Sequence, residues 1–238
     1  MSKIYKKLLF DLDNTLVDDN ENRKYAIKKI LNDRKEEITE EKLDNFIKLD
    51  DKYWKDRAER KIKDPYEFKT LEEKTTWIRA QRFIMYFNCS FEEAVKINEN
   101  YINYLRNSIV PIKNAEEILK YLNKKQYEIY IVTNGPAKPV ENKLNSINAK
   151  KYIKSIFTAE EAGYMKPHQE FFDKFFKKIN NYQKDEMLII GDELEKDVLG
   201  GIQNGIDSCW FNIRNKKNTT GIKPNFEIDD LLELKNIL

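Results

Sequence analysis

Three short apolar runs of the sequence each end in a polar side chain suited to catalysis. These side chains are Asp11, Thr133 and Asp192. Runs that are apolar at consecutive positions suit strands buried on both faces of a parallel sheet. Ligands of open α/β sheets bind outside the carboxyl ends of the strands. The sequence therefore predicts one site at these three positions, although any one of them alone is more simply explained as a turn residue or a helix cap.

The segment directly after the first run carries two carboxylates, Asp11 and Asp13, at positions i and i+2. In extended chain, side chains at this spacing point to the same side. Two like charges this close repel each other, so a cation is needed to keep both ionised. Mg²⁺ suits this place because it takes one or two carboxylates together with phosphate and water. We expect Asp192, from a separate strand, to be the second carboxylate ligand.

The elements that must position these residues alternate between short apolar runs and helical stretches. The expected strands are residues 8–10, 129–132, 156–158, 187–190 and 208–211. Residues 115–123 and 171–179 carry apolar side chains at helical spacing, and residues 229–238 are expected to form a closing helix. This alternation predicts an α/β fold with a Rossmann-like parallel sheet.

One long stretch breaks the alternation. Between residues 18 and 108 the sequence has helical patterns and no convincing strand, with helices expected at 23–31, 40–56, 72–87 and 91–105. Ser90 and Glu93 have the spacing of a capping box at the start of the last of these helices. We therefore expect a core domain of residues 1–17 and 109–238, and a helical domain of residues 18–108 inserted after the first strand.

Composition limits the class of partner. The chain has 238 residues, with 43 Lys and Arg against 41 Asp and Glu, so the net charge of +2 gives no electrostatic case for nucleic acid or a membrane surface. Cys89 and Cys209 lack metal-site spacing and are expected to be reduced thiols. A signal-peptide or membrane-spanning run is not visible, which favours a cytoplasmic protein. The sequence specifies no oligomeric state.

Four motifs together resemble those of the haloacid dehalogenase-like hydrolase superfamily, in the order of that family and over nearly the whole chain. They are Asp11-Leu12-Asp13-Asn14-Thr15, Thr133-Asn134-Gly135, Lys166-Pro167, and Gly191-Asp192 followed by Asp197. The resemblance implies a Rossmann-like core with an inserted α-helical cap domain that closes over the substrate and sets specificity.

The resemblance implies the following chemistry. Asp11 attacks phosphorus and forms an aspartyl-phosphate, which divides one hard displacement into two easier ones. Asp13 protonates the leaving oxygen and then activates water. Mg²⁺ is held by the Asp11 carboxylate, the Asp13 backbone carbonyl and Asp192. Asp13 also argues against carbon–halogen chemistry, since the dehalogenase members lack an acid/base aspartate at that place.

The resemblance also implies a phosphate-binding set. Thr133 donates its hydroxyl to a phosphoryl oxygen, aided by Asn134 and nearby backbone N–H groups, and Lys166 neutralises the phosphoryl group. Asp197 orients Lys166 or a metal-bound water without contacting the substrate itself. Glu193 stands where many members carry a small polar residue; it could join the metal shell, but we expect it to face solvent.

The substrate is predicted from a finer resemblance. Residues 191–201, 204–205, 209–212 and 224–228 resemble the YjjG/YfnB-type branch, which implies a nucleoside 5′-monophosphate phosphatase favouring pyrimidines. The inserted domain is rich in aromatic residues that could stack on a base, although helical spacing is more typical of bundle packing. These aromatic residues are Tyr53, Trp54, Trp77, Phe83, Tyr86 and Phe87.

Three alternatives stay open. The same core chemistry could serve a phosphatase of sugar phosphates or phosphoglycolate, because the cap decides the substrate. A phosphomutase would return the phosphoryl group to an intermediate in place of water. A binding or regulatory protein on an inactive hydrolase scaffold would hold nucleotide without Mg²⁺-dependent turnover.

Overall fold

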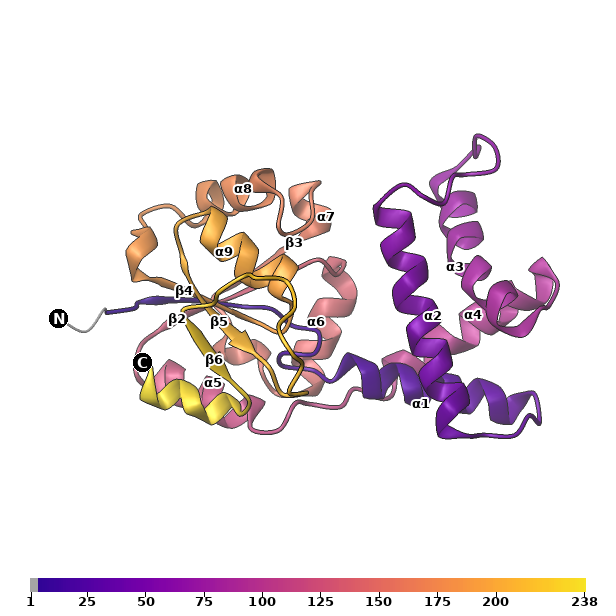
Figure 1. Ribbon diagram of the computed structural model, residues 1–238, viewed down its shortest axis with the longest axis horizontal. Helices are drawn as coiled ribbons and strands as arrows, with labels where there is room; N and C mark the ends of the chain where they lie inside the picture. The colour runs from indigo at the N-terminus through magenta and orange to yellow at the C-terminus, as the bar shows by residue number, and fades with distance from the viewer. Residues whose placement is uncertain (1–3) are drawn as a thin grey trace. The chain divides into compact units, whose positions relative to one another are not determined.

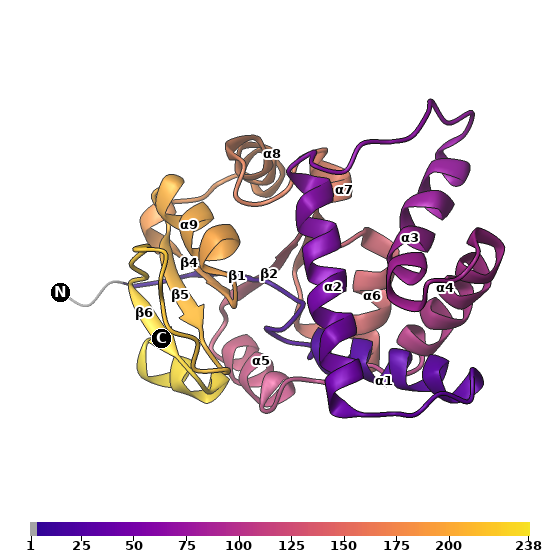
Figure 2. The ribbon, with the colours of Figure 1, turned by 45° about the vertical axis from the view of Figure 1, so that its right-hand side comes forward.

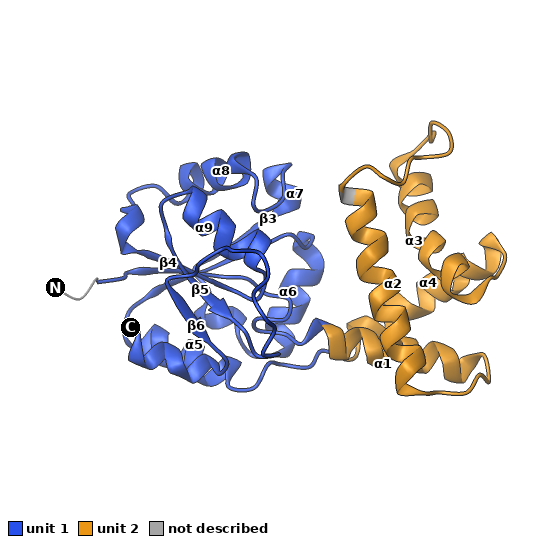
Figure 3. Cartoon of the chain, in the orientation of Figure 1, with its two compact units in different colours: residues 1–19, 109–238 blue, residues 20–108 orange. Residues whose placement is uncertain are grey.

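The chain forms two compact units in the computed structural model, which describes residues 4–238. One unit is the chain up to Asp19 together with Ile109–Leu238, and the other is Asn20–Ser108 (Figure 3). We call them the α/β domain and the helical domain. No helix among the described residues combines the length and the apolar character that a bilayer crossing needs. Both cysteines are free thiols.

The α/β domain is built on one parallel sheet of six strands in the order β3-β2-β1-β4-β5-β6. The strands are β1 (Lys7–Phe10), β2 (Glu128–Thr133), β3 (Ser155–Thr158), β4 (Met187–Gly191), β5 (Asp207–Phe211) and β6 (Phe226–Ile228). The prediction of an α/β fold with a Rossmann-like parallel sheet is confirmed. The edge strand β6 was not predicted, because three residues are too few to show a period.

Both faces of the sheet are buried, as the consecutive apolar runs require. In β1, Leu8 and Phe10 join one core cluster while Leu9 joins the cluster on the opposite face. The second cluster is filled by four buried phenylalanines of α8 (Gln169–Ile179). Each such side chain contributes about 1.5–3 kcal/mol by leaving water.

Helices cover the two faces of this sheet (Figures 1 and 2). They are α5 (Ala115–Lys124), α6 (Ala137–Ser146), α7 (Ala159–Ala162), α8 and α9 (Leu199–Gln203), with a π-helical turn at Leu194–Val198 and 3₁₀ turns at Lys150–Tyr152, Lys184–Glu186 and Leu231–Asn236. The expected closing helix over 229–238 is thus a shorter 3₁₀ turn. Its start is set by a capping box in which Asp230 and Glu233 satisfy each other's backbone N–H groups.

The helical domain contains α2 (Glu40–Ala58), α3 (Leu71–Phe87) and α4 (Phe91–Arg106), and α1 (Asp19–Asp33) leads into it. Thr39, Thr70 and Ser90 each accept a hydrogen bond from the N–H three residues on, which begins α2, α3 and α4. At the last of these caps, the Glu93 carboxylate accepts a hydrogen bond from Arg34.

Aromatic side chains make up much of the core of the helical domain. Phe46, Phe83 and Tyr101 pack against one another with ring centroids 5.3–5.7 Å apart, stacked between the two phenylalanines and edge-to-face against Tyr101. Tyr86 and Phe87 pack against the same cluster. For these residues the helical spacing therefore reflects bundle packing.

Two connecting segments run side by side at the margin of the α/β domain. Val17 forms an antiparallel bridge with Pro111. The Asp18 N–H donates to the Val110 carbonyl at 2.9 Å, and the Ile112 N–H donates to the Leu16 carbonyl at 3.0 Å. The chain thus leaves and re-enters the α/β domain through one paired ribbon.

Candidate active site

The carboxyl ends of β1, β2 and β4 meet at one edge of the sheet. Phe10 is in register with Ile131 of β2 and Ile190 of β4, and the Asp11 N–H donates to the Ile190 carbonyl at 2.8 Å. Asp11, Thr133 and Asp192, one or two residues further along these strands, therefore line one cavity of about 160 Å³. Every site residue expected from the sequence lines this cavity, and so do Asn14, Gly135, Glu193 and Lys196.

Lys166 is buried at the floor of the cavity with three acceptors around its ammonium group. Its Nζ donates to Asp11 Oδ1 at 2.8 Å, to the Val132 carbonyl at 2.7 Å and to Asp197 Oδ1 at 2.6 Å. Burial alone would lower the pKa of Lys166, but the two carboxylates outweigh it and hold the pKa well above its ordinary value. The lysine is therefore a fixed positive charge against Asp11.

The side chain of Asn134 holds the backbone of Lys166. The Lys166 N–H donates to Asn134 Oδ1 at 2.7 Å, and Asn134 Nδ2 donates back to the Lys166 carbonyl at 3.2 Å. This reciprocal pair joins the loop after β2 to the segment that carries the lysine. The amide of Asn134 thus positions the backbone of Lys166, and its expected part in phosphate binding stays a prediction.

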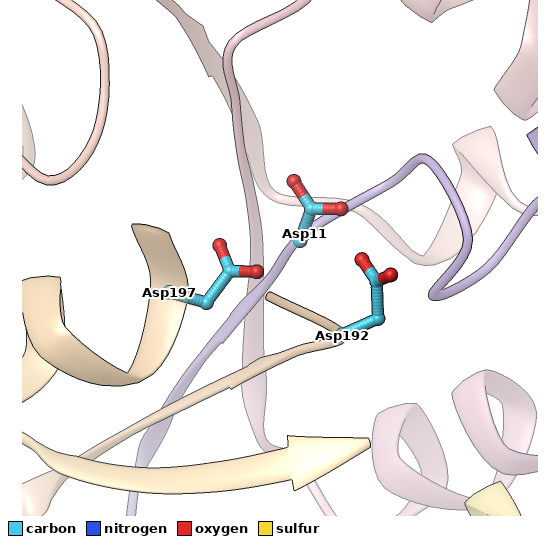
Figure 4. Close-up of side chains that lie close together, drawn as sticks. All are labelled: Asp11, Asp192 and Asp197. Carbon is cyan, nitrogen blue, oxygen red and sulfur yellow. The ribbon is translucent and has the colours of Figure 1, made fainter. Parts of the chain in front are cut away.

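Asp11, Asp192 and Asp197 form a buried acidic cluster in which one oxygen of each lies within 4.8 Å of the others (Figure 4). Burial, followed by the charges of Asp11 and Asp197, raises the pKa of Asp192 to about 8. Burial also raises the pKa of Asp11 to about 6, against the opposing effect of Lys166. Lys166 pairs with Asp11 and Asp197 but not with Asp192, so these four side chains carry two excess negative charges when all three carboxylates are ionised.

The two later carboxylates differ in their partners. Asp197 uses Oδ1 for Lys166 and accepts the Glu193 N–H on Oδ2 at 3.1 Å. Within residues 4–238, the Asp192 carboxylate accepts no hydrogen bond and makes no ion pair, while its backbone carbonyl accepts the Trp210 indole N–H at 2.9 Å. The Trp210 contact thus fixes the backbone of Asp192, and the Asp192 carboxylate remains able to bind a ligand.

Gly191 is required by this packing. A Cβ built there would lie 2.3 Å from the carboxyl group of Asp197, so only glycine lets that side chain cross over the end of β4. The π-helical turn Leu194–Val198 brings Asp197 back over the strand. The position of Asp197 therefore depends on the strand end as much as on its own turn.

Asp13 follows Asp11 by two residues, in a tight loop that lines the same cavity. The Leu16 and Val17 N–H groups both donate to the Leu12 carbonyl, and Asn14 has a φ of +63°. Burial raises the pKa of the Asp13 carboxyl to about 6, while Lys143 opposes the shift.

Lys143 is a site residue that the sequence reasoning missed. Its Nζ donates to Asp13 Oδ1 at 2.5 Å and to Asp19 Oδ1 at 2.8 Å. It lies on α6, a polar helix with a proline in its first turn, which was not predicted. Val140 and Leu144 are the buried residues of that helix, so a helical projection would have placed Lys143, three residues after Val140, on the inward side.

Thr133 and Glu193 both line the cavity and differ in exposure. The Thr133 hydroxyl accepts the Gly135 N–H at 3.0 Å, which leaves its own proton to donate. The Glu193 side chain is 43% exposed and lies 3.7 Å from Lys196 Nζ. Glu193 is therefore partly exposed to solvent, as expected, while it also lines the cavity.

Comparisons with known proteins show which proteins this chain resembles. The sequence profile of the haloacid dehalogenase-like hydrolase family matches residues 8–211. The HAD-hydrolase YfnB of Bacillus subtilis is 28% identical over 236 residues, 99% of this chain and 96% of YfnB. Its crystal structure, described as bound to magnesium and as revealing interdomain movement, superposes with a TM-score of 0.83 at 29% identity and covers 99% of each chain.

Two further relatives are named for their activity. The pyrimidine 5′-nucleotidase PynA of Streptococcus pneumoniae is 28% identical over 239 residues, 98% of this chain and 97% of PynA. The pyrimidine 5′-nucleotidase YjjG of Escherichia coli is 30% identical over 146 residues, 61% of this chain and 64% of YjjG. The resemblance drawn from the four motifs, and from the C-terminal half to the YjjG/YfnB-type branch, is confirmed.

Proposed function

This chain belongs to the haloacid dehalogenase-like hydrolase family and is an enzyme, and we propose that it hydrolyses phosphomonoesters with Mg²⁺ through an aspartyl-phosphate on Asp11. The observation that carries the proposal is the buried cluster of Asp11, Asp192 and Asp197, in which one lysine pairs with only Asp11 and Asp197 and two excess negative charges remain. A divalent cation and a phosphoryl group together suit such a site.

The residues present fit a magnesium ion. Asp197 has both carboxylate oxygens engaged, so Asp11 and Asp192 are the two carboxylates left to hold the ion, with the backbone carbonyl of Asp13. Two carboxylates with water and substrate phosphate match the ligands that Mg²⁺ prefers. When bound, Mg²⁺ supplies the positive charge that screens the repulsion between an anionic nucleophile and an anionic phosphate.

The side chains then divide the chemistry between them. An oxygen of Asp11 forms a bond to phosphorus while the bond to the leaving oxygen breaks, and Asp13 gives that oxygen a proton. In the second half, Asp13 takes a proton from a water molecule whose oxygen attacks phosphorus, and the bond to Asp11 breaks. Thr133 donates its hydroxyl to a phosphoryl oxygen, and Lys166 neutralises the charge that gathers there.

We propose nucleoside 5′-monophosphates, pyrimidines before purines, as the substrates. The support is that two relatives, one of them aligned over 98% of this chain, are pyrimidine 5′-nucleotidases. The cavity of about 160 Å³ is lined by residues of the α/β domain alone, and its size suits a phosphoryl group. We therefore assign substrate choice to the helical domain, predicted as residues 18–108, in the role of a cap.

Phosphate release from a panel of monophosphates, with Mg²⁺ and with EDTA, tests the proposal. The panel sets dUMP, dTMP, UMP and purine monophosphates beside phosphoglycolate and hexose phosphates. Mg²⁺-dependent release, fastest from the pyrimidine nucleotides, is expected. Phosphate release from sugar phosphates alone would support the proposed hydrolysis of phosphomonoesters and overturn the proposed nucleotide specificity. No release from any of them by folded protein with Mg²⁺ would favour a phosphomutase or a binding protein.

A further inference from the structure

Lys143 joins two carboxylates that lie on different segments. It reaches from α6 and places its ammonium group between Oδ1 of Asp13 and Oδ1 of Asp19. Only 17% of its side chain is exposed. A lysine loses hydration when it is covered to this extent, and here two ion pairs offset that loss.

The contact with Lys143 makes the two oxygens of Asp13 different from each other. Oδ1 is bound by the ammonium group. Oδ2 lies toward the phosphate-binding loop, since a Cβ added at Gly135 would stand 3.7 Å from it. Because the carboxylate is held by one oxygen, the other keeps a defined direction into the cavity.

Asp19, the second carboxylate that Lys143 contacts, lies where the chain leaves the α/β domain. It is the first residue of α1, and its N–H donates to the carbonyl of Val17 at 3.0 Å, in the paired ribbon through which the chain leaves the α/β domain. Lys143 thus links the loop that carries Asp13 to the start of the connection toward the helical domain.

We propose that Lys143 is a positioning residue for proton transfer by Asp13, holding Oδ1 so that Oδ2 faces the leaving oxygen of the substrate. The inference rests on the proposed function. As the Asp11–phosphorus bond forms and the ester bond breaks, the proton on Asp13 Oδ2 passes to the leaving oxygen. The same Oδ2 takes a proton from water when the aspartyl-phosphate is hydrolysed.

A structural ion pair and a positioning residue differ in how their loss depends on the leaving group. A nucleoside or alkyl leaving group needs a proton from Asp13, whereas 4-nitrophenolate departs as a stable anion without one. The ratio kcat/KM reports the steps up to the departure of the leaving group. A general structural defect therefore lowers kcat/KM equally for both kinds of substrate, and misplacement of Asp13 lowers it more for the nucleotide.

The experiment compares wild type, Lys143→Met and Lys143→Arg on dUMP and on 4-nitrophenyl phosphate, both with saturating Mg²⁺. General acid–base catalysis contributes typically ~10²–10⁴-fold, so we expect Lys143→Met to lose at least ~10-fold more kcat/KM on dUMP than on 4-nitrophenyl phosphate. Lys143→Arg, which keeps a charge able to bridge two carboxylates, should recover most of that difference. Asp13→Asn should show the same preference, with a larger difference between its kcat/KM losses on dUMP and on 4-nitrophenyl phosphate.

The matched control is Lys150→Met, which removes a lysine of the same domain from its ion pair with Glu141 at 2.7 Å, away from the cavity. Lys150→Met should leave kcat/KM unchanged on dUMP and on 4-nitrophenyl phosphate. Equal losses on the two substrates for Lys143→Met would overturn the inference while leaving the phosphatase intact. Wild-type protein that hydrolyses neither substrate would overturn the proposed function and this inference with it.

A second variant covers the case in which Lys143→Met does not fold. Asp19→Asn removes one anchor of Lys143, keeps the side-chain size and leaves Lys143 beside Asp13. It should show a smaller loss with the same preference for dUMP. An equal loss on both substrates in a folded Asp19→Asn protein would also overturn the inference.

Discussion

Asp192→Asn should remove a pH dependence from the stability of the metal-free protein. Burial and the neighbouring carboxylates raise the pKa of Asp192 from 3.8 to about 8. The folded state therefore keeps a proton that the unfolded state has already lost, and folding stability falls as pH rises from about 4 toward 8. Asparagine has no proton to lose, so this contribution should vanish in the variant.

The size of the effect follows from the same shift. One pKa unit corresponds to about 1.36 kcal/mol, and a group with pKa values of about 4 unfolded and about 8 folded loses about 3 to 4 kcal/mol between pH 5 and pH 8. That is a large fraction of the 5–15 kcal/mol of a typical domain. Mg²⁺ should reverse the loss, since a ligand at one hundred times its Kd adds about 2.7 kcal/mol.

The assay is urea unfolding with EDTA at pH 5, 6.5 and 8, repeated with Mg²⁺ at pH 8. Wild-type protein should lose stability with rising pH in EDTA and regain it with Mg²⁺, while Asp192→Asn should show a smaller pH slope, with the part due to Asp11 and Asp13 remaining, and little response to Mg²⁺. Asp185→Asn, an exposed aspartate in a 3₁₀ turn, is the control and should behave as wild type. A wild-type stability that is flat or rises from pH 5 to pH 8 in EDTA would refute the reasoning.

Three other substitutions test separate parts of the account. Gly191→Ala should displace Asp197, lower the free energy of unfolding by about 1–3 kcal/mol through overpacking and weaken activity. Urea unfolding and phosphate release measure these effects; wild-type values would mean that the end of β4 shifts to make room for the methyl group. Lys166→Met leaves the buried Asp11 and Asp197 carboxylates unpaired, so it should lower the free energy of unfolding by about 3–5 kcal/mol and abolish turnover. An unchanged unfolding midpoint in urea would argue against these ion pairs. Phe175→Ala, at a fully buried position between Tyr130 and Phe157, should cost about 3–5 kcal/mol in urea and leave KM unchanged; a loss below 1 kcal/mol would contradict the described packing.

The strand-end residues were predictable because a parallel sheet leaves little choice of where they go. Runs such as residues 8–10 and 187–190 are apolar at every position, which marks strands covered on both faces, and parallel strands present their carboxyl ends at one edge. Asp11, Thr133 and Asp192 had to meet once those strands were recognised.

Other site features escaped the sequence because they depend on tertiary contacts. Lys143 reaches Asp13 across 130 positions of the chain from a helix whose polar sequence hides its inward side. The amide of Asn134 lies on the backbone of Lys166, a contact that no local pattern encodes. Short elements such as β6 and the 3₁₀ turn Leu231–Asn236 form by packing at the sheet edge and the C-terminus, since so few residues have little preference of their own.

The covalent role of Asp11 is tested most directly by trapping the intermediate. Enzyme turning over dUMP with Mg²⁺ would be quenched in acid, digested and examined by mass spectrometry for the peptide that contains Asp11, with Asp11→Asn treated in parallel. We predict a phosphoryl group on Asp11 in wild-type protein, and neither that group nor phosphate release in Asp11→Asn. A phosphoryl group on another residue, or full turnover by Asp11→Asn, would contradict it.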